Sequence, residues 1–255
     1  MSRSIDLTRP GAGGQSTLAA AIAAARLVCF PTDTVYGIGG VATAATAAAI
    51  ARVKGRPAGK PLQVVYPNLG LLLAGVTLSP AVADAARRLL PGPFTLVVPY
   101  PDGTVFPPPA VVEWPAGAGD RGAGDHGPGG PGAARRGPDD RCSGDRDPGD
   151  VDLPVGVKTL GVRVPDWPRA ARALARLPFP LLASSANRSG GQDPVDLAGV
   201  EPGVRAACDL LLDAGPTSGV SSTVVDLSGL QAGRGFRVLR TGAIGAAEIA
   251  AMLAS

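Results

Sequence analysis

Polar side chains gather where predicted strands and helices end. They supply cations, hydroxyls, one amide and glycine backbone, but no pairing of a nucleophile with a base. Donors and cations of this kind stabilise charge that develops on a phosphate. In phosphoryl or nucleotidyl transfer, positioning supplies most of the rate. The clusters are residues 32–36, 54–60, 184–189 and 218–223, together with two isolated residues on predicted strands, Arg163 and Arg240.

The position of the only histidine argues against several other kinds of chemistry. His126 lies in a segment without Val, Leu, Ile, Phe or Met, which removes serine triads and most zinc sites from the candidates.

The cysteines, Cys29, Cys142 and Cys208, lack a metal-ligand spacing, and their scattered, odd number is typical of a reducing cytosol. There is no Walker A sequence, and residues 37–40 do not form a dinucleotide-binding fingerprint.

Two lysines lie close together in a chain that otherwise uses arginine. Of 24 basic residues, only Lys54, Lys60 and Lys158 are lysines. Because lysine is a compact point charge and arginine a wide fork, a tight phosphate pocket can accept only one of them. We therefore predict a phosphate contact within residues 54–60, although a solvated basic loop would have the same composition. The net charge of +3 fits an anionic ligand without requiring nucleic acid.

Two of the polar clusters directly follow a predicted strand. The first strand, residues 27–30, runs into Pro31, a polar turn and a glycine-rich loop at residues 37–40. The second, residues 179–183, runs into the polar sequence at 184–191. Ligands of open α/β sheets bind where strands end in this way. A strand, a turn and a helix without a ligand is the simpler alternative.

Strands alternate with helices along the chain, which predicts an α/β sheet. Thr43 is placed as an N-cap, and Gly55 is placed as a left-handed C-cap. The predicted helices cover residues 16–25, 43–53, 79–90, 168–177 and 246–253. The predicted strands cover residues 27–30, 61–66, 94–99, 159–164, 179–183, 208–213, 222–227 and 236–239.

Two segments are expected to lie outside the ordered core. Residues 1–14 are polar and glycine-rich, which predicts a flexible lead-in. Residues 116–150 are mainly Gly, Pro, Asp, Arg and Ala, so they cannot offset ordering entropy and are predicted to be a disordered insertion. The remainder, residues 15–255, is expected to form one catalytic domain. Without a signal segment or a membrane-length apolar run, we expect a cytoplasmic protein with no membrane partner.

Seven motifs follow one another along the chain. They are FPTDTVYG at 30–37, KGRP at 54–57 with KPL at 60–62, PGPFTL at 91–96, GVRVP at 161–165, SANRSG at 185–190, STVVD at 222–226 and LRTGAI at 239–244. In this order they resemble the YrdC family, the threonylcarbamoyl-AMP synthases. The resemblance spans residues from about 15 to 250, apart from the insertion, and the ordered set makes it specific.

The resemblance implies a twisted, mixed α/β sheet flanked by helices, with a basic concave face. It implies synthesis of L-threonylcarbamoyladenylate from L-threonine, bicarbonate or CO2, and ATP with Mg2+, with release of pyrophosphate. A threonylcarbamoyl-transferase partner enzyme would then pass the group to an adenosine of tRNA. The Mg2+ would be held by substrate phosphates, which needs few protein carboxylates, so no metal ligand is expected from the protein.

The resemblance also assigns roles to individual residues. Lys54 and Arg56 would be catalytic, by stabilising charge on the phosphates. Residues expected to hold L-threonine are Thr32, Tyr36 and Arg163, with Arg163 on its carboxylate. Residues expected to bind ATP are Lys54, Arg56, Lys60, Thr95, Ser185, Asn187, Ser222 and Arg240.

Three residues depart from the pattern that the resemblance implies. Val65 stands where many members have histidine, Ser221 where many have glutamate, and Asp33 where glutamate is usual. The departures at Val65 and Ser221 keep open a paralogue without threonine-dependent synthase activity. A further alternative is an RNA-binding module, because a basic concave surface can hold double-stranded RNA. The few aromatic residues and the low net charge argue against it.

Overall fold

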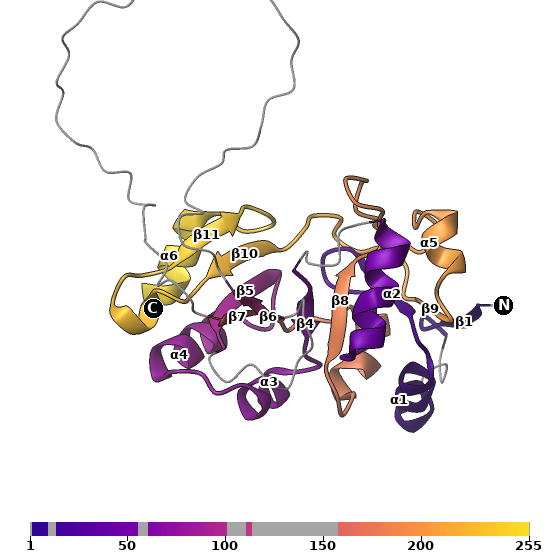
Figure 1. Ribbon diagram of the computed structural model, residues 1–255, viewed down its shortest axis with the longest axis horizontal. Coiled ribbons are helices and arrows are strands. Elements are labelled where there is room, and N and C mark those ends of the chain that lie inside the picture. Colours follow the sequence, from indigo (N-terminus) through magenta and orange to yellow (C-terminus); the bar gives the residue numbers. More distant parts are fainter. Residues whose placement is uncertain (1, 10–13, 56–60, 101–110, 114–157, 255) are drawn as a thin grey trace, which may run out of the picture.

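Figure 1 shows the computed structural model, which describes residues 2–9, 14–55, 61–100, 111–113 and 158–254. Eleven strands form one sheet in the order β1-β9-β2-β3-β8-β4-β7-β5-β10-β11, with β6 paired to β7. The strands are β1 (Arg3–Asp6), β2 (Val28–Pro31), β3 (Tyr36–Val41), β4 (Gln63–Val65), β5 (Phe94–Pro99), β6 (Val111–Glu113), β7 (Lys158–Arg163), β8 (Leu181–Ser185), β9 (Leu210–Asp213), β10 (Thr223–Asp226) and β11 (Arg237–Arg240).

The sheet mixes strand directions and is flanked by helices. Strand β3 is antiparallel to β2 and β8, whereas β4 is parallel to β7 and β5 is parallel to β10. The predicted α/β class with a mixed sheet is therefore confirmed. The helices are α1 (Gln15–Ala24), α2 (Ala44–Lys54), α3 (Leu69–Gly75), α4 (Pro80–Leu89), α5 (Pro202–Ala206), α6 (Ala246–Ala254) and the 3-10 helices η1 (Arg169–Arg176) and η2 (Leu230–Ala232).

Hydrophobic clusters cover both faces of the sheet around β2. Successive side chains of a strand point to opposite faces. Along β2, Cys29 belongs to one hydrophobic cluster, and its neighbours Val28 and Phe30 belong to the other. The first cluster includes buried residues of α2, α3, α4 and α6, and the second includes buried residues of α1 and η1. On β7, in contrast, Leu160 and Val162 belong to the first cluster, whereas the alternate residues Thr159 and Arg163 belong to neither.

The N-terminal segment contains a strand that the sequence analysis did not predict. Strand β1 pairs in parallel with β9, with Arg3 opposite Leu210 and Asp6 opposite Asp213. Its four residues are exposed or half-buried. Because none of them is in the core, the sequence shows no alternation of apolar and polar residues that would distinguish a strand from a loop. The prediction of a flexible lead-in is therefore wrong for residues 3–6.

The glycine-rich stretch at residues 37–40 is a strand and not a loop. It lies within β3, where Gly39 is opposite Ala183 of β8. A Cβ atom on Gly39 would lie 2.1 Å from the carbonyl oxygen of Leu182. Glycine is required here because a neighbouring backbone approaches closely, which is one of the few reasons for glycine inside a strand.

Helix ends followed the sequence where a local capping signal existed. The side chain of Thr43 accepts a hydrogen bond from the Thr46 amide, and Gly55 has a φ of 61°, as predicted for the two ends of α2. Helix α3 was not predicted, although the Asn68 side chain caps it by accepting from the Leu71 amide at 2.9 Å. The predicted helix at residues 168–177 is the 3-10 helix η1.

Some predictions fall outside the described residues. These are the insertion at 116–150 with His126 and Cys142, and the candidate site residues Arg56 and Lys60. Among the helices that the structure describes, none combines the length and the hydropathy needed to cross a bilayer.

Substitution Gly39→Ala should destabilise the fold, because its methyl group would collide with backbone and not with a movable side chain. We expect a loss of about 3 kcal/mol in the free energy of unfolding, at the upper end of overpacking costs. Gly161→Ala is the matched control, since a Cβ on this strand glycine would meet its nearest neighbour at an ordinary 3.8 Å. Urea unfolding of both variants measures the difference, and equal stability of the two would contradict the account.

Candidate functional site

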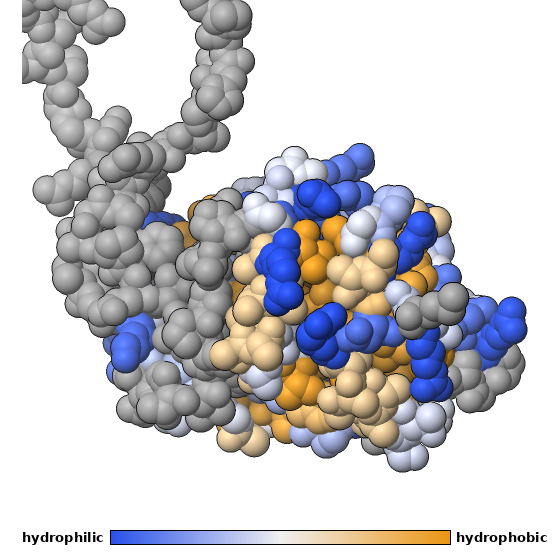
Figure 2. Space-filling model, turned by 45° about the vertical axis from the view of Figure 1, so that its right-hand side comes forward, coloured by the Kyte–Doolittle hydropathy of each residue, from blue (hydrophilic) through white to orange (hydrophobic). Residues whose placement is uncertain are grey.

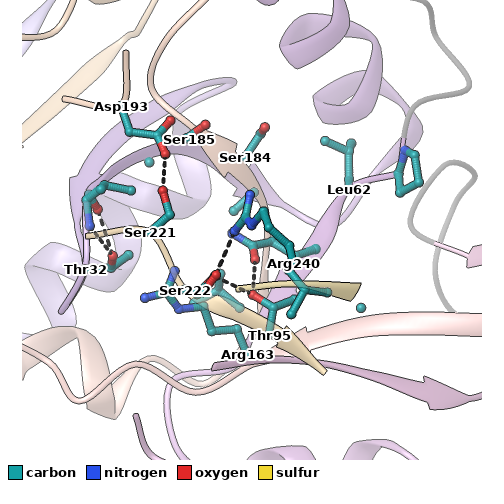
Figure 3. Close-up of a pocket in the computed structure, with 18 of the residues that line it drawn as sticks. Thr32, Leu62, Thr95, Arg163, Ser184, Ser185, Asp193, Ser221, Ser222 and Arg240 are labelled. Carbon is teal, nitrogen blue, oxygen red and sulfur yellow. Dashed lines mark hydrogen bonds between the residues drawn. The ribbon is translucent and has the colours of Figure 1, made fainter. Parts of the chain in front are cut away.

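A cavity of about 390 Å³ lies on one face of the sheet, where alternate residues along β4, β5, β7 and β8 line it. Figure 3 shows its labelled side chains converging from several strands and from the loops between them. The cavity brings together six of the predicted site residues. These are Thr32, Thr95, Arg163, Ser185, Ser222 and Arg240.

The turn between β2 and β3 forms one wall of the cavity. The hydroxyl of Thr32 donates to the carbonyl of Val35 at 2.7 Å and accepts from the Val35 amide at 3.3 Å. Threonine hydroxyls often close turns by bonding to nearby backbone in this way. Thr32 is buried, so its side chain is fixed in the cavity wall by its own turn.

Arg163, the last residue of β7, is a buried cation in the cavity wall. It is 2% exposed, and its Nη2 donates to Asp33 and, at 2.6 Å, to the hydroxyl of Thr34. Its Nε is buried and has no hydrogen-bond partner among the described residues. Leaving a charged donor buried and unsatisfied is costly, so this guanidinium is suited to receive an anionic group of a ligand.

The partner of Arg163 is itself held firmly. The second oxygen of Asp33 accepts from the Asp166 amide at 3.2 Å. Burial raises the pKa of the Asp33 carboxyl, and the charge of Arg163 opposes that rise. The turn after β2 and the loop after β7 are thus joined by one buried ion pair.

A hydroxyl network lies on another wall of the cavity. The parallel pairing of β5 with β10 sets Thr95 beside the start of β10, and the Thr95 and Ser222 hydroxyls lie 2.9 Å apart. The hydroxyl of Thr95 also donates to Gln63 at 3.0 Å. Arg240, at the end of β11, donates through Nη2 to the Ser222 carbonyl at 2.9 Å. This wall combines small donors with one cation, which suits an oxyanion.

Lys54 is not among the described residues that line the cavity, and its role as a phosphate ligand stays a prediction. The side chain is buried, and its ammonium donates to the carbonyls of Ser185 and Asn187, both at 2.6 Å, and to the Asn187 side chain at 2.7 Å. These acceptors match the three donors of an ammonium group. Lys54 and Asn187 therefore hold the loop after β8, and Ser185 is the member of this group that reaches the cavity.

Tyr36 also lies apart from the cavity lining, although it was predicted to hold L-threonine. Its hydroxyl donates to the Gly215 carbonyl at 2.9 Å and accepts from the Ala214 amide at 3.1 Å. Burial raises the pKa of this hydroxyl, which keeps it protonated. Tyr36 joins β3 to the loop after β9 and acts as a support for the site.

Several residues of the lining were not among the predicted site residues. Gln63, Ser184 and Asp193 line the cavity, as does Ser221, whose hydroxyl donates to Asp193 at 2.5 Å. Asp193 and Ser221 lie on irregular loops, where no periodicity marks the direction of a side chain. The available signals were that Ser221 belongs to the polar cluster at 218–223 and that Asp193 follows the cluster at 184–189.

The arrangement suits binding and charge stabilisation. The cations in the described lining are Arg163 and Arg240, accompanied by hydroxyls and one carboxylate. The described cysteines are buried, and burial raises the pKa of Cys208 to about 12, which makes a thiolate nucleophile unfavourable. The basic concave face stays a prediction, because two of its expected cations lie outside the described residues.

Comparisons with known proteins identify the family of this chain. The profile of the Sua5/YciO/YrdC family, described as telomere recombination, matches residues 20–111 and 150–242. A threonylcarbamoyl-AMP synthase of Pyrococcus abyssi is 29% identical over 208 residues, covering 80% of this chain and 47% of that protein. A Mycobacterium tuberculosis relative is 30% identical over 239 residues, covering 91% of this chain and 86% of that protein.

A solved structure resembles the whole described fold. It is the crystal structure of Pyrococcus abyssi Sua5 complexed with L-threonine, which is 27% identical with a TM-score of 0.66. The match covers 99% of this chain and 60% of that one. The chain thus spans about half to two thirds of the length of its Pyrococcus relatives.

Substitution Lys54→Met should destabilise the protein by about 2–4 kcal/mol, because it leaves buried acceptors without their charged donor. Arg52→Met is the matched control: the residue is exposed on the same helix, and its loss should cost less than about 1 kcal/mol. Urea unfolding compares the variants with the wild type. If Lys54→Met retained wild-type stability and lost only ligand affinity, Lys54 would be a ligand residue and not a structural one.

Proposed function

Because the chain belongs to the Sua5/YciO/YrdC family, we propose that it synthesises L-threonylcarbamoyladenylate from L-threonine, bicarbonate or CO2, and ATP. The observation that carries the proposal is Arg163, a buried guanidinium in the cavity wall whose Nε has no partner among the described residues. A guanidinium pairs with carboxylates and phosphates, and the carboxylate of an amino acid is such a group. An α-amino acid bound there would enter the cavity beside Thr32.

The second group of donors suits the nucleotide. The hydroxyls of Thr95 and Ser222 and the guanidinium of Arg240 lie together on the wall formed by β5, β10 and β11. Ser185 reaches the same cavity from the loop that Lys54 holds. These groups would bind phosphate oxygens and stabilise the charge that builds on the α-phosphate and the leaving pyrophosphate.

The proposed chemistry needs positioning more than a protein nucleophile. The neutral threonine amine attacks the carbon of CO2 and releases a proton to give the carbamate; starting from bicarbonate, one molecule of water is lost as well. An oxygen of the carbamate then attacks the α-phosphate of ATP. The bond from the α-phosphate to pyrophosphate then breaks. Holding both substrates in one cavity makes the second step effectively unimolecular. Mg2+ bound mainly through the phosphates would supply further charge stabilisation, which fits a described lining with a single carboxylate.

The product is a reactive mixed anhydride, so we expect a second enzyme to consume it. In the proposed sequence that enzyme is a threonylcarbamoyl-transferase, and tRNA is its acceptor. We place this activity in the cytoplasm, where both ATP and tRNA are available.

Pyrophosphate release tests the proposed function. With ATP and Mg2+, the protein should release pyrophosphate only when both L-threonine and bicarbonate are present. Omission of either one should reduce the rate to background, because the nucleophile that attacks ATP needs both. Release that does not depend on threonine would refute the proposal in favour of another adenylate-forming reaction, and absence of ATP binding would favour the RNA-binding alternative.

Substitution Arg240→Gln should raise the KM for ATP on the order of tenfold, because it removes a charged donor from the nucleotide wall. The KM for L-threonine should change little. Arg234→Gln makes the same charge change at an exposed residue outside the cavity lining and should leave both constants unchanged. Steady-state kinetics with each substrate varied in turn measures these effects. An equal rise in both KM values for Arg240→Gln would contradict the assignment of separate walls.

A further inference from the structure

Asp193 is the only carboxylate in the described lining of the cavity. One of its oxygens, Oδ2, accepts from the Ser221 hydroxyl at 2.5 Å. The other, Oδ1, accepts no hydrogen bond from the described residues, and no cation pairs with this side chain among them. Figure 3 shows Asp193 and Ser221 together on the side of the cavity where Thr32 lies. An acceptor for a cationic group of a ligand is therefore present and open.

Backbone contacts fix the loop of Asp193 against the turn after β2. The amide of Tyr36 donates to the carbonyl of Pro194 at 2.9 Å, directly after Asp193 in the chain. The loop that carries Ser221 is tied to the same turn, because the Gly219 amide donates to the Thr34 carbonyl at 2.8 Å. The loops of Asp193 and Ser221 are thus both anchored to the turn after β2. The same turn carries Thr32 and the two partners of Arg163.

The wall around this turn therefore carries both signs of charge. Arg163 offers an unpartnered donor to an anion, and Asp193 offers an unpartnered acceptor to a cation. An α-amino acid at neutral pH carries both groups on one carbon, so a site for it needs both partners. Phosphate oxygens, in contrast, would be repelled by the carboxylate, which favours placing ATP toward Arg240 and Ser222.

We propose that Asp193, oriented by Ser221, binds the α-amino group of the amino acid substrate while Arg163 binds its carboxylate. This inference rests on the proposed function and names a further residue of the same site. The carboxylate accepts a hydrogen bond from the ammonium group and thereby holds the nitrogen in place. The nitrogen attacks CO2 only after it has lost a proton to solvent. Ser221 acts as a positioning residue, because its hydroxyl fixes one carboxylate oxygen and leaves the other for the substrate.

Substitution Asp193→Asn tests the inference, since asparagine can still accept from Ser221 but carries no charge. Calorimetry should show L-threonine binding weakened on the order of 10- to 100-fold, the usual effect of losing one charge-assisted hydrogen bond. The Kd for ATP with Mg2+ should be unchanged. Asp196→Asn is the matched control: this carboxylate accepts from the Gly199 amide at 2.6 Å and lies in the same loop but outside the described lining.

A ligand without the amine separates a charge contact from a general disturbance of the site. For 2,3-dihydroxybutanoate, the analogue of threonine with a hydroxyl in place of the amine, wild type and Asp193→Asn should differ by less than about threefold. Equal weakening for both ligands would mean that the substitution disturbs the fold of the site, and it would overturn the inference.

The remaining outcomes distinguish this inference from the proposed function. If wild type binds no L-threonine, the proposed function fails before Asp193 is considered. If wild type binds threonine and Asp193→Asn binds it equally well, the proposed function stands and the role of Asp193 is refuted. If Asp193→Asn loses affinity for ATP with Mg2+ and keeps that for threonine, the carboxylate serves the metal and not the amine.

Discussion

The buried charge of Arg163 is the constraint on which the rest of the site depends. A guanidinium that is 2% exposed has to be paired, because an isolated buried charge is far too costly. The pairing with Asp33 and Thr34 joins the turn after β2 to the end of β7 across about 130 residues of chain. It also satisfies only part of the guanidinium, which leaves Nε for a ligand. The same interaction thus closes the fold and creates the binding site.

A second buried cation holds another part of the cavity wall in a comparable way. Lys54 ends α2 and uses its ammonium to hold the loop after β8 through Ser185 and Asn187. Glycines in β3 allow β8 to approach closely enough for that loop to reach the cavity. Asp193, later in the same loop, adds the only carboxylate of the described lining. The cavity is therefore assembled from long-range polar contacts placed on a rigid sheet.

Features that depend on neighbouring residues could be predicted from the sequence. The caps at Thr43 and Gly55, most strands and the polar residues that follow them could be identified, because each leaves a signal within a few positions. Contacts between residues that are distant in the chain could not be identified from the sequence. Tyr36 and Lys54 were expected to face ligands, and their contacts with Gly215 and Asn187 depend on pairing that the sequence does not encode locally. Asp193 was missed because it lies in an irregular loop, where no periodicity indicates the direction of a side chain.

If one cavity holds an amino acid at Arg163 and a nucleotide at Arg240, a crystal structure of this protein with L-threonine and a non-hydrolysable ATP analogue will show both ligands there. The threonine carboxylate should lie within hydrogen-bond distance of Arg163 Nε, and the phosphates should lie beside Ser222 and Arg240. A nucleotide phosphate on Arg163, or threonine bound outside this cavity, would refute this assignment.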